Sequence, residues 1–242
     1  FSSSISRQGG LIAFASEASN LVDRDTNGET DVFVHHRVTG ATTRVSVSSG
    51  GVQAKGRSWA ASLSASGRYV AFVSAASNLV AEDTNGFNDV FVHDQETGAT
   101  TRVSVSSDGT QSNGNSTAPQ LSADGRCVAF ESDANNLVAG DENGRSDVFV
   151  HDRQTGTTTR VSVSSAGEEG AGESAAPSIS SNGRYIAFHS AASNLVVTDT
   201  NGYPDVFVYD RNTGTTVRVS VDSNEQEGNG ATAQHARLPV GA

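Results

Sequence analysis

The chain has 242 residues, of which 35% are hydrophobic and 18% are charged, and its formal net charge is −11. This acidic balance argues against nucleic acid and anionic membranes as partners, because phosphate recognition needs an excess of lysine and arginine. No apolar run approaches the roughly 20 residues that cross a bilayer, so we expect no membrane insertion.

The sequence contains one cysteine, Cys127, and no methionine. A single cysteine excludes a disulfide within the chain. Because the sequence starts at Phe1 without an initiator methionine, we expect that a leader has been removed, and secretion is the commonest reason for such processing. A truncated start is the alternative. We therefore expect a secreted or extracytoplasmic protein.

Four copies of one unit account for most of the chain. The tetrapeptide Asp-Val-Phe-Val begins at Asp31 and returns every 58 residues, at Asp89, Asp147 and Asp205. Such self-similarity is typical of an architecture that stacks one supersecondary unit. We expect a single propeller domain over 1–242, with repeats at 1–58, 59–116, 117–174 and 175–232 and a tail at 233–242 that either adds a strand or is disordered.

Each repeat is predicted to contain four short strands joined by turns, described here for the third copy. A turn at Ala123–Gly125 separates the first two strands, and a hairpin turn at Arg153–Gly156 separates the last two. Valine alternates with polar residues in the last strand, as in a strand with one buried face. The expected strands are Pro119–Ser122, Arg126–Phe130, Asp147–His151 and Thr159–Ser164. The pattern predicts an all-β fold, a β-propeller with four blades of four antiparallel strands.

The repeat resembles one found in a known family. Pro119–Phe130 and Pro177–Phe188 are similar to the WD-repeat-like propeller repeat of TolB-type proteins, and the Asp-Val-Phe-Val-His-Asp stretch from Asp147 fits the same pattern. The resemblance covers all four repeats and implies an exported bacterial propeller. It does not define the function, because the family includes binding scaffolds, accessory domains and some enzymes. We expect either a closed four-blade ring or part of a larger ring completed by association, and so a homo-oligomer is one expectation.

The connection between the second and third strands carries the most informative residues. In the first repeat it reads Asp25-Thr26-Asn27-Gly28-Glu29-Thr30-Asp31, and its first, third, fourth and seventh positions are identical in all four copies. A turn alone would need only Asn-Gly, whereas calcium requires six to eight oxygens from carboxylates and carbonyls on a tightly turned loop. We therefore predict calcium as a cofactor. The predicted ligands are Asp25, Asn27, Asp31, Asp83, Asn85, Asp89, Asp141, Asn143, Asp147, Asp199, Asn201 and Asp205.

The loop resembles the calcium loop of integrin-type propellers and, more distantly, the EF-hand. It is shorter than both and has no closing glutamate, so further ligands would come from water or from repeated upstream asparagines such as Asn20 and Asn78. The alternative is a structural turn, in which Asp25 accepts backbone N–H groups and Asp31 pairs with a repeated arginine such as Arg44. The sequence supports the two interpretations about equally.

The histidines provide weaker evidence for function. His35, His93 and His151 occupy one position of the third strand, and we expect a packing role because catalytic sites are rarely fourfold copies. His189 and Glu131 are the residues best suited to catalysis if the protein is an enzyme. No nucleophile elbow, metal triad or phosphate-binding loop accompanies them. We therefore assign no catalytic residues and favour a binding protein over an enzyme.

A ligand-binding face is predicted where the repeats differ. Trp59 is the only tryptophan, and it lies near Lys55 and Arg57 on the connection between two repeats. In a four-stranded meander this connection emerges at the same end as the acidic loops, which carry Phe87 and Tyr203. Aromatic rings beside polar groups suit sugar binding, because a ring stacks on the C–H face of a sugar. The alternative is that Trp59 packs into a blade junction.

These patterns together indicate a secreted calcium-binding propeller that binds carbohydrate, a cell-surface polymer or a protein through its loop face. The alternatives are a polysaccharide-acting lyase or hydrolase, and a protein–protein interaction scaffold without a small ligand. Eight loop aspartates contribute much of the acidity, so one calcium ion in each loop would change the net charge from −11 to −3.

Overall fold

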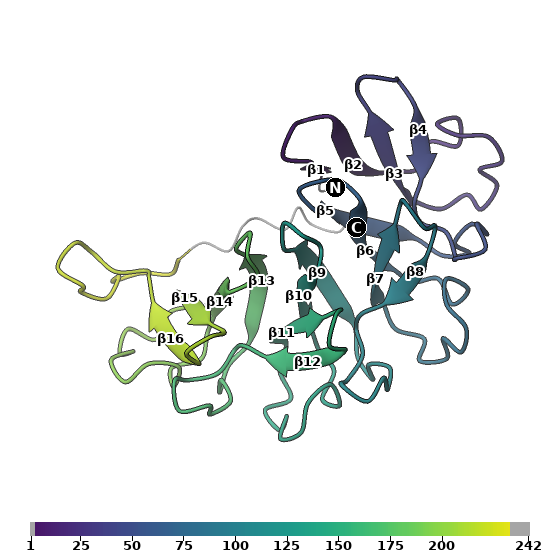
Figure 1. The fold of residues 1–242 in the computed structure, drawn as a ribbon. Helices are drawn as coiled ribbons and strands as arrows, with labels where there is room; N and C mark the ends of the chain where they lie inside the picture. Colours follow the sequence, from purple (N-terminus) through teal and green to yellow (C-terminus); the bar gives the residue numbers. More distant parts are fainter. Residues whose placement is uncertain (1–2, 233–242) are drawn as a thin grey trace.

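The computed structural model describes residues 3–232, so the predicted tail at 233–242 lies outside the described residues. Residues 3–232 form four sheets, and the four strands of each sheet pair antiparallel in chain order. None of these residues belongs to a helix with the length and apolarity needed to cross a bilayer. The predicted all-β propeller with blades of four antiparallel strands is confirmed (Figure 1).

Each repeat contributes one blade. Blade 1 contains β1 (Ser3–Ile5), β2 (Leu11–Ser16), β3 (Asp31–His36) and β4 (Thr42–Arg44). Blade 2 contains β5 (Ser58–Leu63), β6 (Tyr69–Ser74), β7 (Asp89–Asp94) and β8 (Thr100–Arg102). Blade 3 contains β9 (Ser116–Leu121), β10 (Cys127–Ser132), β11 (Asp147–Asp152) and β12 (Thr157–Arg160). Blade 4 contains β13 (Ser174–Ile179), β14 (Tyr185–Ser190), β15 (Asp205–Asp210) and β16 (Thr215–Arg218).

The repeated phenylalanines and valines explain why the two middle strands pair. Phe14 of β2 lies opposite Phe33 of β3, and their rings stack with centroids 5.9 Å apart. The other blades repeat this pair. Side chains alternate between the faces of a strand, so Val32 and Val34 lie on the opposite face, where both are buried. Each blade therefore has two apolar faces that neighbouring blades can cover.

The fourth strand is shorter than predicted. It was expected over Thr159–Ser164 in the third repeat, but β12 ends at Arg160. Beyond it, the Ser162 hydroxyl accepts the N–H of Val148 at 3.1 Å and donates to Asp147 at 2.5 Å. Valine continues to alternate with polar residues after Arg160 although the strand has ended. The N–H of Val148 bonds to the Ser162 side chain there, where a longer strand would offer a main-chain carbonyl.

The first strand starts earlier than predicted. In blade 3, β9 begins at Ser116 rather than at Pro119. Its pairing with β10 shifts register at a bulge, and Ala118 beside the bulge has φ of 52°. A bulge leaves one residue unpaired, so the strand can continue through Pro119, which has no N–H to pair.

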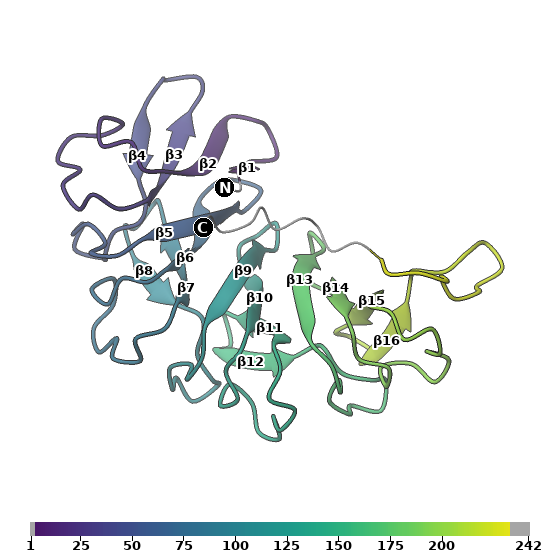
Figure 2. The same ribbon diagram turned by 180° about the vertical axis from the view of Figure 1, so that it is seen from behind.

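Successive blades pack face to face through apolar clusters. Between blades 1 and 2, Val45 shares a buried cluster with Ala76 and Leu79. Similar clusters join blade 2 to blade 3 and blade 3 to blade 4. The first strands of the blades pack against one another along the inner side of the arc. The four blades form an open arc, with blade 1 at one end and blade 4 at the other (Figures 1 and 2).

The repeated histidines have the packing role that was expected. His93 and His151 are buried, and each Nδ1 lies 2.9 Å from a threonine hydroxyl, that of Thr100 and Thr158 respectively. Burial lowers the pKa of both histidines. Cys127 is also buried, in the cluster between blades 3 and 4. These side chains support the fold rather than a surface site.

Candidate functional site: the acidic loops

Each acidic loop is built around a buried aspartate at the start of the third strand. In blade 3, Asp147 Oδ1 accepts a hydrogen bond from Ser162 Oγ at 2.5 Å, and its Oδ2 accepts one from Asn143 Nδ2 at 2.9 Å. Asn143 Oδ1 accepts the N–H of Arg145 at 2.6 Å, which closes an Asx turn. The other blades repeat these bonds. The invariant Asp and Asn therefore stabilise the loop whether or not it binds an ion.

An arginine from the end of the fourth strand lies between the two aspartates of each loop. Arg160 Nη1 lies 3.6 Å from Asp141 Oδ2 and 3.7 Å from Asp147 Oδ2. Arg44 Nη1 likewise lies 3.5 Å from Asp31 Oδ2. The pairing of Asp31 with Arg44, which belonged to the structural-turn interpretation, is confirmed. One guanidinium thus offsets part of the negative charge in every loop.

A fifth residue completes each loop, and the sequence analysis missed it. It lies on the connection to the next blade, at the repeat position of Gln53, Gln111, Glu169 and Glu227. Gln53 Nε2 donates to Asp25 Oδ1 at 2.7 Å and to Asp31 Oδ2 at 2.9 Å, so a side-chain amide serves Asp25 where backbone N–H groups were expected. Glu169 instead accepts bonds from Arg160 and from a backbone N–H. Aligning the repeats reveals the signal, an amide in the first two copies and a carboxylate in the last two.

This difference divides the loops into two kinds. In blades 1 and 2, two carboxylates face one guanidinium, which leaves one excess negative charge. In blades 3 and 4, three carboxylates face one guanidinium, which leaves two. The oxygens of each triad lie within 4.8 Å of one another, so two acidic clusters could hold a metal ion. The clusters are Asp141, Asp147 and Glu169 in blade 3, and Asp199, Asp205 and Glu227 in blade 4.

One oxygen in each triad is buried without a hydrogen-bond donor. These atoms are Asp141 Oδ2 and Asp199 Oδ1, and they lie 3.6 and 3.8 Å from Nη1 of Arg160 and Arg218, respectively. Burial, reinforced by the charge of Asp147, raises the pKa of Asp141 to about 6. A buried carboxylate that lacks donors is costly to ionise, and a bound cation would remove that cost.

The charge in the blade 4 cluster is unevenly distributed. Burial and the neighbouring Asp205 raise the pKa of Asp199. Burial opposes the ionisation of Glu227, but hydrogen bonds from Thr200 and Asn201 and the charge of Arg218 together lower its pKa to about 2. Thr200 supplies its hydroxyl at 2.7 Å and its N–H at 3.0 Å. Glu227 is therefore held as a carboxylate beside an aspartate whose ionisation is unfavourable.

The asparagines do not offer oxygen to these clusters in this conformation. The loop asparagines turn their Nδ2 toward the aspartate and use Oδ1 in the Asx turn, as Asn143 does. The upstream asparagines tie neighbouring segments together instead: Asn78 Nδ2 donates to Gln53 O, and its Oδ1 accepts the N–H of Lys55. Ligation by either set of asparagines remains a prediction.

The predicted ligand-binding residues share one end of the blades but not one site. The N–H of Ser58 donates to the carbonyl of Thr30 at 2.7 Å, which joins the connection between blades to an acidic loop. Trp59 is partly buried against the cluster between blades 2 and 3, and Arg57 lies over its ring at 5.0 Å. Part of the Trp59 ring therefore packs into a blade junction, as in the alternative interpretation of this residue. The Lys55 side chain is exposed nearby.

The two loop aromatics are exposed on different blades. Phe87 is 39% exposed on blade 2, and Tyr203 is 48% exposed on blade 4. Tyr203 lies within the loop that carries Asp199 and Asp205. It is therefore the predicted ligand-binding residue that belongs to a loop with a three-carboxylate cluster.

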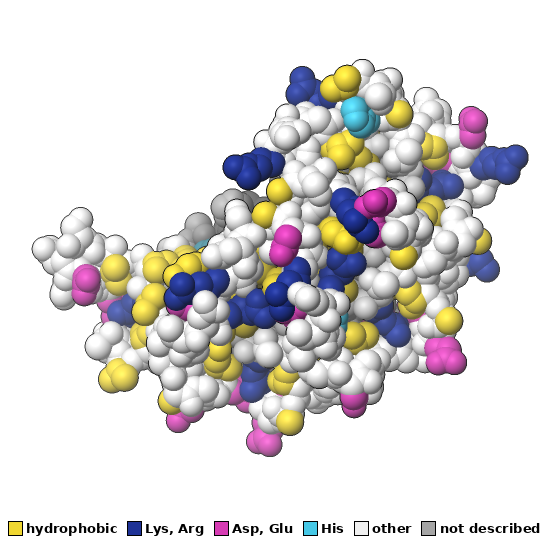
Figure 3. All heavy atoms as spheres, viewed as in Figure 1, with side chains coloured by type: hydrophobic (Ala, Val, Ile, Leu, Met, Phe, Trp, Pro, Cys, Tyr) yellow, Lys and Arg dark blue, Asp and Glu magenta, His cyan; other side chains and the backbone are white. Residues whose placement is uncertain are grey.

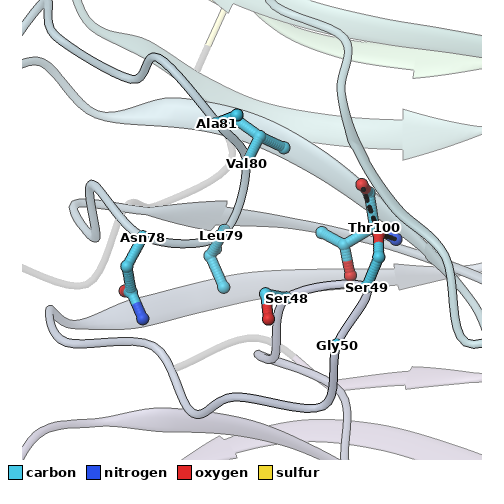
Figure 4. Close-up of a pocket in the computed structure, with 8 residues that line it drawn as sticks. All are labelled: Ser48, Ser49, Gly50, Asn78, Leu79, Val80, Ala81 and Thr100. Carbon is cyan, nitrogen blue, oxygen red and sulfur yellow. Dashed lines mark hydrogen bonds between the residues drawn. The ribbon is translucent and has the colours of Figure 1, made fainter.

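Two open recesses lie where successive blades meet. The first, of about 430 Å³, lies between Ser48–Gly50 and Asn78–Ala81, with Thr100 at its wall (Figure 4). The second, of about 650 Å³, occupies the equivalent place between blades 2 and 3. The predicted ligand-binding residues line neither recess, and neither is a deep catalytic cleft.

Of the two residues considered for an enzyme, Glu131 lies at a blade junction and His189 lies within the blade 4 sheet. Glu131 is buried in blade 3, and its Oε2 accepts the N–H of Ala176 in blade 4 at 3.2 Å. His189 lies on β14, with Val206 of β15 and Ala175 of β13 on either side. This arrangement gives Glu131 a role in blade packing.

No protein-family model matches the chain, and no curated protein matches its sequence. Among solved structures, TolB from Acinetobacter baumannii superposes with a TM-score of 0.57 at 19% identity, over 94% of this chain and 45% of that one. A putative TolB from Agrobacterium tumefaciens gives 0.56 at 16% identity, over 89% and 63%. An oligogalacturonate lyase in complex with manganese gives 0.52 at 11% identity, over 90% and 52%. These similarities establish a TolB-like propeller fold, and the chain spans about half of these longer proteins.

Proposed function

We propose that this chain is a secreted calcium-binding β-propeller that binds carbohydrate or a cell-surface polymer at its loop face. The fold, shared with TolB-like propellers, fits a ligand-binding or protein-interaction module. The calcium part of the proposal rests on one observation, the third carboxylate that Glu169 and Glu227 add to two of the four loops.

The donor set in blades 3 and 4 suits a hard divalent cation. Calcium prefers carboxylate and carbonyl oxygens over nitrogen or sulfur. Asp141, Asp147 and Glu169 supply carboxylates, and one oxygen of Asp141 is buried without a donor. Arg160 balances one of the three negative charges, and one calcium ion would balance the other two. Blades 1 and 2 offer an amide in place of the third carboxylate, so we assign calcium to blades 3 and 4.

Replacing the third carboxylate with its amide tests this assignment. Glu169→Gln combined with Glu227→Gln gives blades 3 and 4 the loop composition of blades 1 and 2, so the variant is expected to fold. Titration of chelator-treated protein with calcium chloride in a calorimeter should yield two sites in the wild type and none in the variant. Four sites, or equal binding by the variant, would contradict the assignment.

The carbohydrate part rests on Tyr203. Its exposed ring lies in the blade 4 loop beside a cluster that could hold a cation, so a sugar could stack on the ring while its hydroxyls or carboxylates meet the ion. A glycan array probed with and without chelator provides the test, with Tyr203→Ala as the variant. Phe87→Ala is the matched control, because its loop lacks the third carboxylate. An array with no calcium-dependent binding would favour the protein-interaction alternative.

The extracytoplasmic location is also a proposal, and it is supported by the resemblance to exported TolB-type propellers. Fractionating cells that express the native gene, with an antibody against this chain, tests it. Recovery outside the cytoplasm is expected, and recovery with the cytoplasmic proteins would contradict the location while leaving the calcium sites untouched.

A further inference from the structure

The junction between blades repeats three times within the chain, and its apolar part is constant. A valine after the fourth strand of one blade packs on an alanine and a leucine of the next. These valines are Val45, Val103 and Val161, and none is more than 1% exposed. We call the side of a blade that carries this valine its trailing face, and the side that carries the alanine and leucine its leading face. Each junction thus joins the trailing face of one blade to the leading face of the next.

A first set of hydrogen bonds also recurs at each junction. The N–H of Thr100 in blade 2 donates to Ser49 Oγ at 2.9 Å, and its hydroxyl donates to the carbonyl of Val47 at 2.5 Å. Thr158 and Thr216 make the same two bonds to the preceding blade. This threonine, which is the first or second residue of the fourth strand, is therefore a fixed part of the leading face.

A second set involves the upstream asparagines. Asn78 of blade 2 bonds the carbonyl of Gln53 and the N–H of Lys55 on the connection from blade 1. Asn136 and Asn194 repeat these two bonds in blades 3 and 4. One asparagine of each leading face therefore forms hydrogen bonds to the connection from the preceding blade.

Blade 4 keeps the trailing-face residues but leaves them exposed. Val219 is 46% exposed, whereas its equivalent Val161 is fully buried. Tyr185 is 40% exposed, although its equivalent Cys127 is buried. Figure 3 shows hydrophobic side chains at the surface over blade 4. Nothing in residues 3–232 covers this face in the way that each blade covers the one before it.

Blade 1 keeps the leading-face residues and also leaves them exposed. Ile5 is 61% exposed, whereas its equivalent Leu63 is 8% exposed. Leu21 and Thr42 are half-buried, although their counterparts in blades 2 to 4 are buried, and Asn20 is exposed. The two ends of the arc in Figure 1 therefore carry the two complementary halves of one junction.

We propose that the blade 1 face of a second copy of this chain docks on the blade 4 face of the first, head to tail, through this junction. Leu21 of the second copy then covers Val219. Thr42 of the second copy bonds to Val221 and Ser223. Asn20 of the second copy bonds the main chain of Glu227 and Asn229, which are the equivalents of Gln53 and Lys55.

An aromatic contact makes this pairing specific. In the junction between blades 2 and 3, the Arg153 guanidinium lies over the Tyr69 ring at 4.3 Å and donates to the carbonyl of Gly125. Blade 4 repeats the tyrosine as Tyr185. Blade 1 repeats the arginine as Arg37, which donates to the carbonyl of Gly9 at 3.0 Å. Arg37 of the second copy therefore lies over Tyr185, and the new junction reproduces the one between blades 2 and 3.

Continuity with the internal junction favours a second copy over an unrelated partner. An unrelated protein would have to present leucine, threonine, asparagine and arginine at the spacings of this repeat. A head-to-tail contact closes into a ring if its rotation permits. Two copies joined at both ends give eight blades, which is within the four-to-eight range of propellers.

Complementation between two blocked variants tests the proposal. Val219→Asp blocks the trailing face, and Ile5→Asp blocks the leading face. Light scattering after size exclusion should give the wild type twice the chain mass of 24.9 kDa and each variant the single mass. An equimolar mixture should recover a dimer, because it restores one intact junction. Val197→Asp, a fully exposed position on a blade 4 loop, should behave like the wild type.

Two results would overturn the proposal. One is a wild type of single mass at 100 µM, which would mean that the chain closes on itself or that other blades cover the faces. The other is a mixture that stays monomeric while both variants keep the wild-type circular dichroism spectrum. Recovery of the dimer in the mixture also excludes misfolding of the variants, because a misfolded blade cannot dock.

Discussion

At the scale of single residues, one repeat position separates the two kinds of loop. Gln53 and Glu169 have the same shape, but the amide donates two hydrogen bonds to aspartates while the carboxylate can only accept. In blade 1 the amide therefore supplies donors to the aspartates, and in blade 2 Gln111 Nε2 donates to Thr84 Oγ1 instead. The carboxylate of blades 3 and 4 adds a negative charge to the loop. Chemistry at this position, rather than the invariant Asp and Asn, distinguishes the loops that we assign to calcium.

Gln53→Glu should create a third calcium site. It gives the blade 1 loop the three carboxylates found in blade 3, so the calorimetric stoichiometry should rise from two to three. Without calcium the variant should lose about 1–3 kcal/mol of stability, because Asp25 Oδ1 and Asp31 Oδ2 each lose one hydrogen-bond donor and gain a neighbouring carboxylate. Gln53→Ala is the control, and a stoichiometry of three in that variant would show that the third carboxylate is not the determinant.

Trp59 and Tyr203 should respond differently to truncation. Trp59→Ala should lower the free energy of unfolding by about 2–3 kcal/mol, because part of its ring packs in the cluster between blades 2 and 3. Tyr203→Ala should change stability by less than about 0.5 kcal/mol, as for most surface positions. Urea unfolding of the two variants measures both values, and equal losses would contradict this placement.

At the scale of elements, the strands could be predicted because the repeat shows them four times. Alternating Val and Phe located the middle strands, and Gly located the turns between them. The fourth strand was overextended because Ser162 replaces main-chain pairing with a side-chain bond, which valine alternation does not reveal. The first strand was predicted to begin too late, because a bulge that contains Ala118 and Pro119 allows a proline within the strand.

The acidic site was only partly predictable for a similar reason. The aspartates and asparagines of one loop are close in sequence, so their pattern was visible. Glu169 reaches the loop from the connection to the next blade, and its contact with Arg160 depends on the folding of a whole blade. Reading the loop as one segment also hid the way Asn143 turns its nitrogen toward Asp147.

Ion pairs between arginine and aspartate join the turns at the other end of the blades, and they should make the stability of the fold sensitive to acid. Arg68 donates to both oxygens of Asp94 at 2.9 and 2.7 Å, and this bonding lowers the pKa of Asp94 from 3.8 to about 2. Because the pKa is lower in the folded state, the folded chain binds fewer protons in this range. The stabilisation is thus present above about pH 4 and is lost as the pH falls toward 2.

Asp94→Asn removes this ion pair and should reveal how its contribution to stability depends on pH. The variant should melt below the wild type at pH 7, and the difference should shrink as the pH falls toward 2. Melting curves at several pH values measure this trend. A difference that stays constant down to pH 2 would show that Asp94 acts through packing rather than through its charge.

At the scale of the whole molecule, burial of equivalent residues depends on which blade follows. Val161→Ala should cost about 2 kcal/mol, because it removes two buried methyl groups at a closed junction. Val219→Ala should cost less than about 0.5 kcal/mol in dilute protein, because the side chain is half exposed. At high protein concentration the cost at Val219 should rise toward that at Val161 if a second copy covers it. Concentration-dependent melting compares the two.

The central claim is that the third carboxylate selects which loops bind calcium. Anomalous diffraction from a crystal grown with calcium chloride tests it most directly. The account predicts two calcium peaks, one among Asp141, Asp147 and Glu169 and one among Asp199, Asp205 and Glu227, with none at the loops that contain Gln53 and Gln111. Peaks in all four loops, or in none, would contradict it.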